Sequence, residues 1–214
     1  MILAILDYGM GNLRSVEKAL ERVGAGAEIT HEPARIRAAD GLILPGVGAF
    51  PRAMERVREL GLDELVRERL DAGVPVLGIC LGLQLLFDAS VEGAGAEGLG
   101  LMAGPVEPLA ADGLKVPHIG WSPVRWERAS RLTDGLEGET PFYFVHSFTP
   151  RPESPDEVLG TVAYGERLAC AVERAPLYGV QFHPEKSSSA GLRLLSNFAR
   201  ICASATTASA AVRQ

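Results

Sequence analysis

One segment, residues 74–87, constrains the fold most strongly, because it joins a buried strand to a helix through a cysteine flanked by glycines. Residues 74–79 are apolar and rich in β-branched side chains, which predicts a buried strand. A helical pattern begins at residue 81, and Gly78 and Gly82 flank Cys80. Glycines are needed where a backbone turns this tightly, since side chains would clash. We therefore expect a sharp elbow with Cys80 at the carboxyl end of the strand.

This placement suits Cys80 for nucleophilic chemistry. The positive end of a helix dipole favours a thiolate, and an elbow presents the sulfur at an edge of the sheet. The alternative for Cys80 taken alone is a structural role, since most free cysteines behave as small buried hydrophobes. A second motif is needed to choose between the two interpretations.

Residues 178–187 contain that second motif. Residues 178–182 have the pattern of another core strand, and His183 and Glu185 follow it, separated by Pro184. A residue before proline favours extended backbone, which directs side chains two positions apart to the same side. Glu185 is therefore expected to reach one imidazole nitrogen while the other faces a thiol, as in a catalytic triad. A lone histidine here would be structural; both motifs at strand ends favour the triad.

The two motifs resemble those of the class I glutamine amidotransferase family, whose Cys-His-Glu triad hydrolyses glutamine. They are Gly-Ile-Cys-Leu-Gly-Leu-Gln (78–84) and Gln-Phe-His-Pro-Glu (181–185). Further motifs, in the same order and spacing, are similar to one branch of that family, the glutaminase subunits of imidazole glycerol phosphate synthase in histidine biosynthesis. These motifs are Asp-Tyr-Gly-Met-Gly-Asn (7–12), Leu-Pro-Gly-Val-Gly-Ala-Phe (44–50), Pro-His-Ile-Gly-Trp (117–121), Tyr-Phe-Val-His-Ser-Phe (143–148) and His-Pro-Glu-Lys-Ser-Ser (183–188).

The resemblance runs from residue 2 to about residue 202, with two departures. Ser122 stands where the branch usually has Asn, and Phe148 where it often has Tyr. Neither position belongs to the expected triad, so the departures concern the partner surface and the substrate loop.

The resemblance implies hydrolysis of the glutamine side-chain amide by Cys80, His183 and Glu185, without a metal or cofactor. The glycine turn at 45–48 follows a buried strand, as Cys80 does, so its N–H groups are candidates to hold an oxyanion; the alternative is an ordinary tight turn. The oxyanion-hole candidates are Gly46, Val47, Gly48 and Leu81.

The glutamine contacts implied by the resemblance are Gln84, Glu92, Ser147 and Phe148, with Gly48. Taken alone, Gln84 would be interpreted as a solvated helix residue.

The resemblance also implies a partner, because free ammonia would be wasted. That partner is the cyclase subunit, a (β/α)₈ barrel that uses ammonia to form imidazole glycerol phosphate and an aminoimidazole carboxamide ribonucleotide. Aromatic and long basic side chains are common interface anchors. The interface candidates are Asn12, Lys115, His118, Trp121, Tyr143 and Lys186. Nearby prolines and Gly120 favour a shaped loop at Trp121 rather than a strand interior; core packing is the alternative.

Composition limits the class of protein. A net charge of −6 disfavours nucleic acid or an anionic membrane as a partner. Three cysteines are too few for a disulfide framework and favour a reducing compartment. The first apolar run stops at Asp7 without a basic segment before it, so it predicts a strand rather than a signal peptide, and no apolar run approaches membrane-spanning length. We expect a soluble, cytoplasmic protein.

The order of elements predicts an α/β fold, a three-layer sandwich with a mainly parallel central sheet and a small antiparallel extension. Strands are expected at 2–6, 41–44, 74–79, 142–145, 158–164, 168–172 and 178–182, and helices at 12–23, 53–60, 62–70, 81–87 and 189–203. The resemblance adds that this fold is flavodoxin-like. We expect one domain over 1–203 and a disordered tail over 204–214.

Three other functions stay open on the sequence. The chain could serve another amidotransferase, act as a stand-alone cysteine hydrolase, or be a subunit with a dead site. Residues 117–121 and 143–148 favour the histidine pathway over the first, and intact Cys80, His183 and Glu185 disfavour the last. If the peptide at 46–48 rests with its N–H turned away, hydrolysis would wait for the partner.

Overall fold

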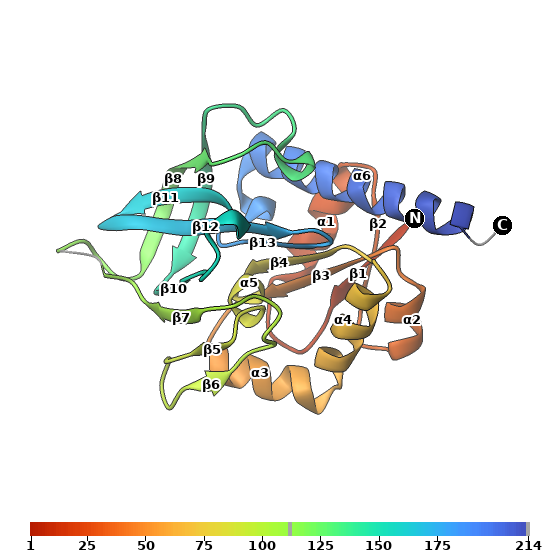
Figure 1. Cartoon of the computed structure of the whole chain (residues 1–214), viewed down its shortest axis with the longest axis horizontal. Helices are drawn as coiled ribbons and strands as arrows, with labels where there is room; N and C mark the ends of the chain where they lie inside the picture. The colour runs from red at the N-terminus through yellow and green to blue at the C-terminus, as the bar shows by residue number, and fades with distance from the viewer. Residues whose placement is uncertain (111–112, 213–214) are drawn as a thin grey trace.

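The computed structural model describes residues 1–110 and 113–212, in which nine strands form one large mixed sheet (Figure 1). In spatial order they are β2 (Gly26–Thr30), β1 (Ile2–Leu6), β3 (Gly41–Gly46), β4 (Val76–Cys80), β13 (Leu177–Val180), β12 (Glu166–Arg174), β11 (Val158–Tyr164), β8 (His118–Trp126) and β9 (Glu139–His146). Pairings from β2 to β13 are parallel, and those from β13 to β9 are antiparallel. The predicted α/β fold is confirmed, with an antiparallel part as wide as the parallel one.

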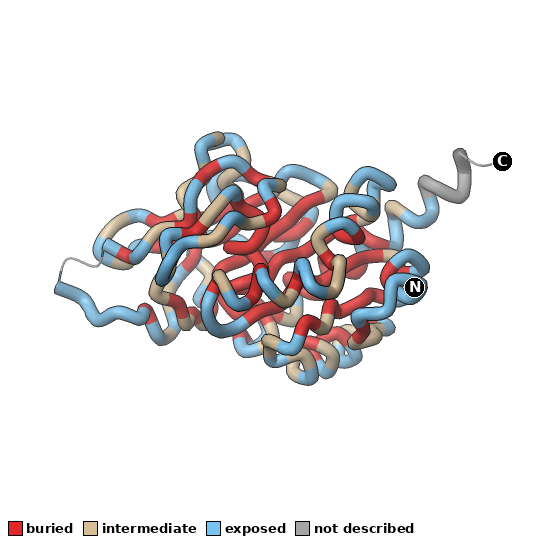
Figure 2. Tube along the Cα trace, turned by 90° about the horizontal axis from the view of Figure 1, so that it is seen from below, coloured by how far each residue is buried: buried red, intermediate tan, exposed pale blue. Residues whose placement is uncertain are grey.

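Helices cover both faces of the parallel half (Figure 1). One face carries α1 (Leu13–Arg22) and α6 (Ser188–Val212); the other carries α2 (Pro33–Ala38), α3 (Phe50–Glu59) and α4 (Leu62–Asp71). Strand alternation explains this: Leu3 and Ile5 pack with Leu20 in one apolar cluster, while Leu6 packs with Met54 in the other. Figure 2 shows the buried strands as the centre of the molecule.

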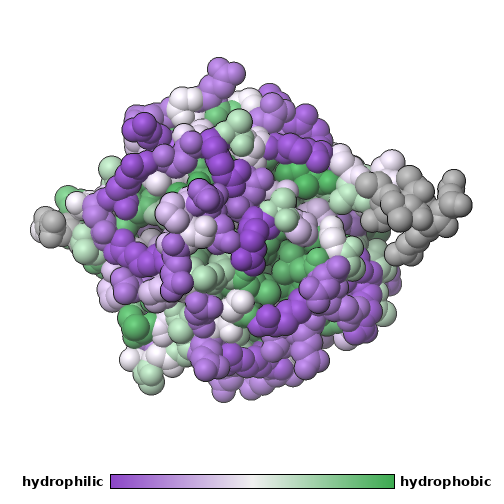
Figure 3. Space-filling model, viewed as in Figure 1, coloured by the Kyte–Doolittle hydropathy of each residue, from purple (hydrophilic) through white to green (hydrophobic). Residues whose placement is uncertain are grey.

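A second, smaller sheet lies beside the first and contains β10 (Phe148–Pro150), β7 (Pro105–Pro108), β5 (Ala89–Ser90) and β6 (Ala96–Glu97). Short 3₁₀ turns occupy η1 (Arg131–Thr133), η2 (Pro155–Glu157) and η3 (Pro184–Lys186), and α5 (Leu81–Leu85) follows β4. On the face shown in Figure 3, hydrophilic side chains predominate and apolar ones gather in the hollows between them. No helix among the described residues is both long and apolar enough to cross a membrane.

Trp121 lies in a strand, contrary to the shaped loop expected from its neighbours. In β8 it stands opposite Tyr143 of β9. The expectation failed because β11 pairs with β8 only from Val124 onward, so the first part of β8 has one free edge. Proline is tolerated on such an edge.

The last helix continues beyond the point where a disordered tail was expected. Instead of ending at residue 203, α6 runs to Val212; residues 213–214 lie outside the described residues. Alanine needs no apolar stripe to be helical. The Ser204 and Thr207 hydroxyls also donate to carbonyls four residues earlier, and Thr206 donates to Asp40.

Candidate active site

The predicted elbow is present, and its geometry explains both flanking glycines. Cys80 ends β4 with φ 55° and ψ −111°, a conformation that L-residues rarely adopt. A Cβ on Gly82 would overlap the Leu44 carbonyl oxygen, and one on Gly78 would lie 2.7 Å from the Gly82 oxygen. The turn is therefore possible only with these glycines, and it sets the sulfur at the end of the sheet.

His183 and Glu185 lie together, as the sequence predicts, although the backbone differs from the expected one. Pro184 begins the 3₁₀ turn η3 rather than continuing the strand. Glu185 Oε1 lies 2.9 Å from His183 Nδ1, and both side chains are almost fully buried. With Nδ1 donating to the carboxylate, Nε2 is the nitrogen left for Cys80.

The pKa of His183 is raised from 6.5 to about 9. Burial is the largest single influence and lowers the pKa, but hydrogen bonds to Cys80 and Glu185 and the negative charges of both residues outweigh it. A pKa above neutrality means that the imidazole is protonated at pH 7. The site therefore favours the imidazolium form of His183.

Cys80 and His183 line a cavity of about 270 Å³ with all of the residues predicted to hold glutamine. The other lining residues are Val47, Gly48, Leu81, Gln84, Glu92, Pro117, Val145, His146, Ser147, Phe148 and Lys186. Glu185 lies behind the imidazole, and Gly46 lies beside Cys80 in the sheet register. The fold thus brings the predicted nucleophile, base, turn and substrate loop to one place.

Hydrogen bonds to the protein fix two polar side chains in the cavity, Glu92 and Gln84, and leave one side-chain oxygen of each for a ligand. Glu92 Oε2 accepts from the Phe50 N–H at 2.7 Å. Gln84 Nε2 donates to the Phe148 carbonyl and to Gln181 Oε1, both at 3.0 Å. The Glu92 Oε1 and Gln84 Oε1 atoms remain acceptors for a ligand ammonium or amide.

Tyr8, which the sequence motifs contain but did not single out, supports the glycine turn. Its hydroxyl donates to the Pro45 carbonyl at 2.6 Å, and a Cβ on Gly46 would overlap that hydroxyl. Burial, reinforced by the charge of Cys80, raises the pKa of Tyr8, so the phenol stays protonated and can donate.

His118 is buried, with 2% of its surface exposed, rather than displayed on the partner surface as expected. Its side chain lies on the face of β8 opposite to that of the exposed Ile119, where it stacks on Tyr164 and Phe144. Its Nδ1 lies 3.0 Å from His146 Nε2, and its Nε2 lies 2.9 Å from Ser122 Oγ. Ser122, one of the two departures noted in the sequence, thus lies within hydrogen-bond distance of His118.

The other interface candidates lie at the surface, except that Tyr143 is half-buried. Trp121 is 54% exposed and packs edge-on against Tyr143. Asn12, Lys115 and Lys186 are exposed. Lys186 also lines the cavity.

His146 supplies a prediction about acid stability. Burial, the main cause, and the charges of His118 and His183 lower its pKa from 6.5 to about 4, against a raising hydrogen bond to Phe148 O. The unfolded chain takes up this proton near pH 6.5 and the folded chain only near pH 4, so stability is lost as pH falls through that window. His146→Asn, which keeps a donor at Phe148, is expected to lose about 3 kcal/mol less than the parent between pH 7 and 4 in urea titrations. Exposed His31→Gln is the control, and equal losses in all three proteins would contradict the prediction.

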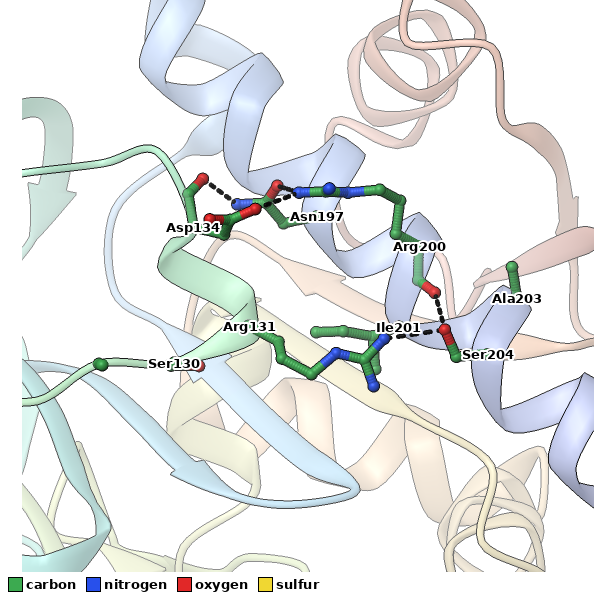
Figure 4. A pocket seen from close by; sticks show the side chains of 9 residues that line it. Ser130, Arg131, Asp134, Asn197, Arg200, Ile201, Ala203 and Ser204 are labelled. Carbon is green, nitrogen blue, oxygen red and sulfur yellow. Dashed lines mark hydrogen bonds and ion pairs between the residues drawn. The ribbon is translucent and has the colours of Figure 1, made fainter.

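A larger hollow of about 750 Å³ lies between η1 and α6, away from Cys80 (Figure 4). Its charged groups already have partners: Arg200 pairs with Asp134, and Arg131 donates to Ser204. No cysteine or histidine lines this hollow. Among residues 1–110 and 113–212, no group of three or more His, Cys, Asp or Glu residues is placed to hold a metal ion.

Known proteins resemble this chain in sequence and in fold. The family model described as "Glutamine amidotransferase class-I" matches residues 4–202. The chain is 53% identical to imidazole glycerol phosphate synthase subunit HisH of Moorella thermoacetica, over 93% of this chain and 94% of that protein. It is 49% identical to the subunit of the same name from Symbiobacterium thermophilum, over 93% of each. A crystal structure of a glutamine amidotransferase shares the fold, with a TM-score of 0.75 at 23% identity over 95% of this chain and all of the other.

Proposed function

The chain belongs to the class I glutamine amidotransferase family, and we propose that it is the glutaminase subunit of an imidazole glycerol phosphate synthase in histidine biosynthesis. Cys80 is the nucleophile, His183 the acid and base, and Glu185 the carboxylate that orients the imidazole. The observation that carries these roles is the buried His183–Glu185 contact of 2.9 Å beside Cys80, at a cavity with acceptors for an amino acid.

The first half of the reaction forms a thioester. The Cys80 thiolate attacks the side-chain carbonyl carbon of glutamine, and the backbone N–H of Leu81 with those of the 46–48 turn stabilises the oxyanion. The His183 imidazolium then gives its proton to the leaving nitrogen, which departs as ammonia. A raised pKa of about 9 keeps that proton available at neutral pH.

The second half hydrolyses the thioester. Neutral His183 takes a proton from water, the resulting hydroxide attacks the carbonyl carbon, and the sulfur leaves as a thiolate. Glutamate departs and the thiolate–imidazolium pair is restored. Glu185 orients His183 and stabilises the imidazolium in both halves.

Substrate recognition follows from the charges in the cavity. The free Glu92 oxygen suits the α-ammonium of glutamine, and Gln84 Oε1 suits another donor of the substrate. Ser147 and Phe148 contribute backbone groups, so phenylalanine in place of tyrosine at 148 leaves those groups unchanged.

The ammonia is delivered to a cyclase partner with a (β/α)₈ barrel. The exposed side of β8 carries Ile119 and Trp121, and with Asn12, Lys115, Tyr143 and Lys186 it forms the proposed docking surface.

Trp121→Ala is expected to weaken binding of the cyclase about thirtyfold, as for an aromatic anchor. Isothermal titration calorimetry against the cyclase would measure this; Ile2→Ala, an exposed apolar change at the start of β1 and outside the docking surface, is the control. Unchanged affinity would remove Trp121 from the docking surface.

Transfer of nitrogen tests the proposed function. With glutamine labelled with ¹⁵N in its amide, the chain, the cyclase and its nucleotide substrate are expected to place ¹⁵N in imidazole glycerol phosphate, even when unlabelled ammonium is present in excess. Label diluted to the composition of the bulk ammonium would contradict a coupled complex. Failure to release glutamate at all would favour a dead-site subunit.

A further inference from the structure

Gln181 is a fully buried polar residue that the triad does not include. It follows β13, which runs parallel to β4 with Val180 opposite Ile79. That register places the next residue, Gln181, beside Cys80. Its Nε2 atom lies 3.7 Å from Cys80 Sγ, within reach of an N–H···S hydrogen bond.

Two hydrogen bonds decide which end of the Gln181 amide faces the sulfur, and the first of them is to the Phe148 carbonyl. The Phe148 oxygen can only accept, so the Gln84 atom 3.0 Å from it must be Nε2. That nitrogen also lies 3.0 Å from one end of the Gln181 amide, which must therefore be the acceptor, Oε1. The remaining end, the donor Nε2, then faces the sulfur.

The Cys80 sulfur has two polar contacts, and they favour different protonation states of the sulfur. Cys80 Sγ lies 3.7 Å from the Val145 carbonyl oxygen, an acceptor that favours the thiol. An N–H from Gln181 favours the thiolate, in addition to His183. Gln181 thus opposes the Val145 carbonyl at the reacting atom.

We propose that Gln181 is a positioning residue for the nucleophile: its N–H holds the Cys80 sulfur as an anion, and Gln84 with the Phe148 carbonyl fixes its amide. The proposal deepens the function given above, on which it rests for the nucleophilic role of Cys80. Because the Phe148 carbonyl belongs to the proposed substrate loop, one hydrogen-bonded chain orders that loop and the sulfur together.

Alkylation of Cys80 by iodoacetamide tests this without glutamine or a partner, so its outcome is independent of the proposed function. Gln181→Met keeps the volume and removes the donor. We expect alkylation at pH 7 to slow about tenfold, and its pH midpoint to rise by about one unit, as for loss of a hydrogen bond to a charged group. Peptide mass spectrometry assigns the label to Cys80 rather than to the fully buried Cys170 or Cys202.

Asn197→Leu is the matched control, because Asn197 is also a buried amide and donates to the Leu132 and Asp134 carbonyls, outside the cavity that holds Cys80. It is expected to lower stability and leave the alkylation profile unchanged. If Gln181→Met does not fold, Gln181→Glu, which still accepts from Gln84 but places a carboxylate at the sulfur, is expected to shift the profile in the same direction. An unchanged profile in the folded Gln181 variant, or an equal shift in Asn197→Leu, would overturn the proposal.

Discussion

Replacing Cys80 with alanine is expected to lower glutamate release about 10⁶-fold, to the limit of detection, with or without the cyclase. The reason is that a thioester cannot form without the sulfur, and triad members act as a unit. Cys170→Ala is the matched control, since Cys170 is also a buried cysteine but lies in the sheet core outside the cavity. That variant should lose stability and keep its activity per folded molecule; residual turnover by Cys80→Ala within tenfold of the parent would exclude Cys80 as nucleophile.

The backbone at Cys80 also gives a prediction about stability. A side chain at φ 55°, ψ −111° strains the backbone, whereas glycine adopts this conformation freely. Cys80→Gly is therefore expected to be about 1 kcal/mol more stable than Cys80→Ala in chemical denaturation, although both are inactive. If the glycine variant were the less stable of the two, the elbow would hold no strain.

Replacing Glu185 with glutamine is expected to lower kcat by about 10³- to 10⁴-fold, the second largest effect. A glutamine amide can donate to Nδ1 and so stabilise the wrong tautomer, and it no longer stabilises the imidazolium. The hydrogen bond and charge of Glu185 help to raise the pKa of His183, so in the variant that pKa falls. The alkaline limb of the kcat/KM–pH profile, which reports the free enzyme and is set near pH 9 by loss of the His183 proton, should move to lower pH.

Glu68→Gln is the control for that change of charge, since Glu68 is an exposed carboxylate paired with Arg37. It should leave both kcat and the pH profile unchanged. A Glu185→Gln variant with a normal profile and kcat within tenfold of the parent would remove Glu185 from the mechanism.

The sequence was most informative where a local pattern decides the structure. Residues 2–6 and 158–164 form strands with the predicted bounds, because apolar runs of that length have few alternatives. The elbow at Cys80 followed from its glycines. By contrast, β2 and α2 were missed, since β2 is an edge strand and α2 buries only Ile36, so neither has a clear apolar pattern.

Contacts between distant segments were beyond prediction. Gln84 and Gln181 are 97 positions apart, and their hydrogen bond depends on the register between β4 and β13. The burial of His118 likewise depends on aromatic partners from β9 and β11. Motif spacing carries no information on such registers, which is why His118 was expected at the surface and Gln181 was not singled out.

The most direct test is the rate of glutamate release from glutamine by this chain alone, then with the cyclase, and then with the cyclase and its nucleotide ligand. We predict a low rate for the chain alone that rises strongly only when both are present. A high rate for the chain alone that the cyclase leaves unchanged would contradict a partner-gated glutaminase and indicate a free-standing hydrolase or a subunit of another amidotransferase.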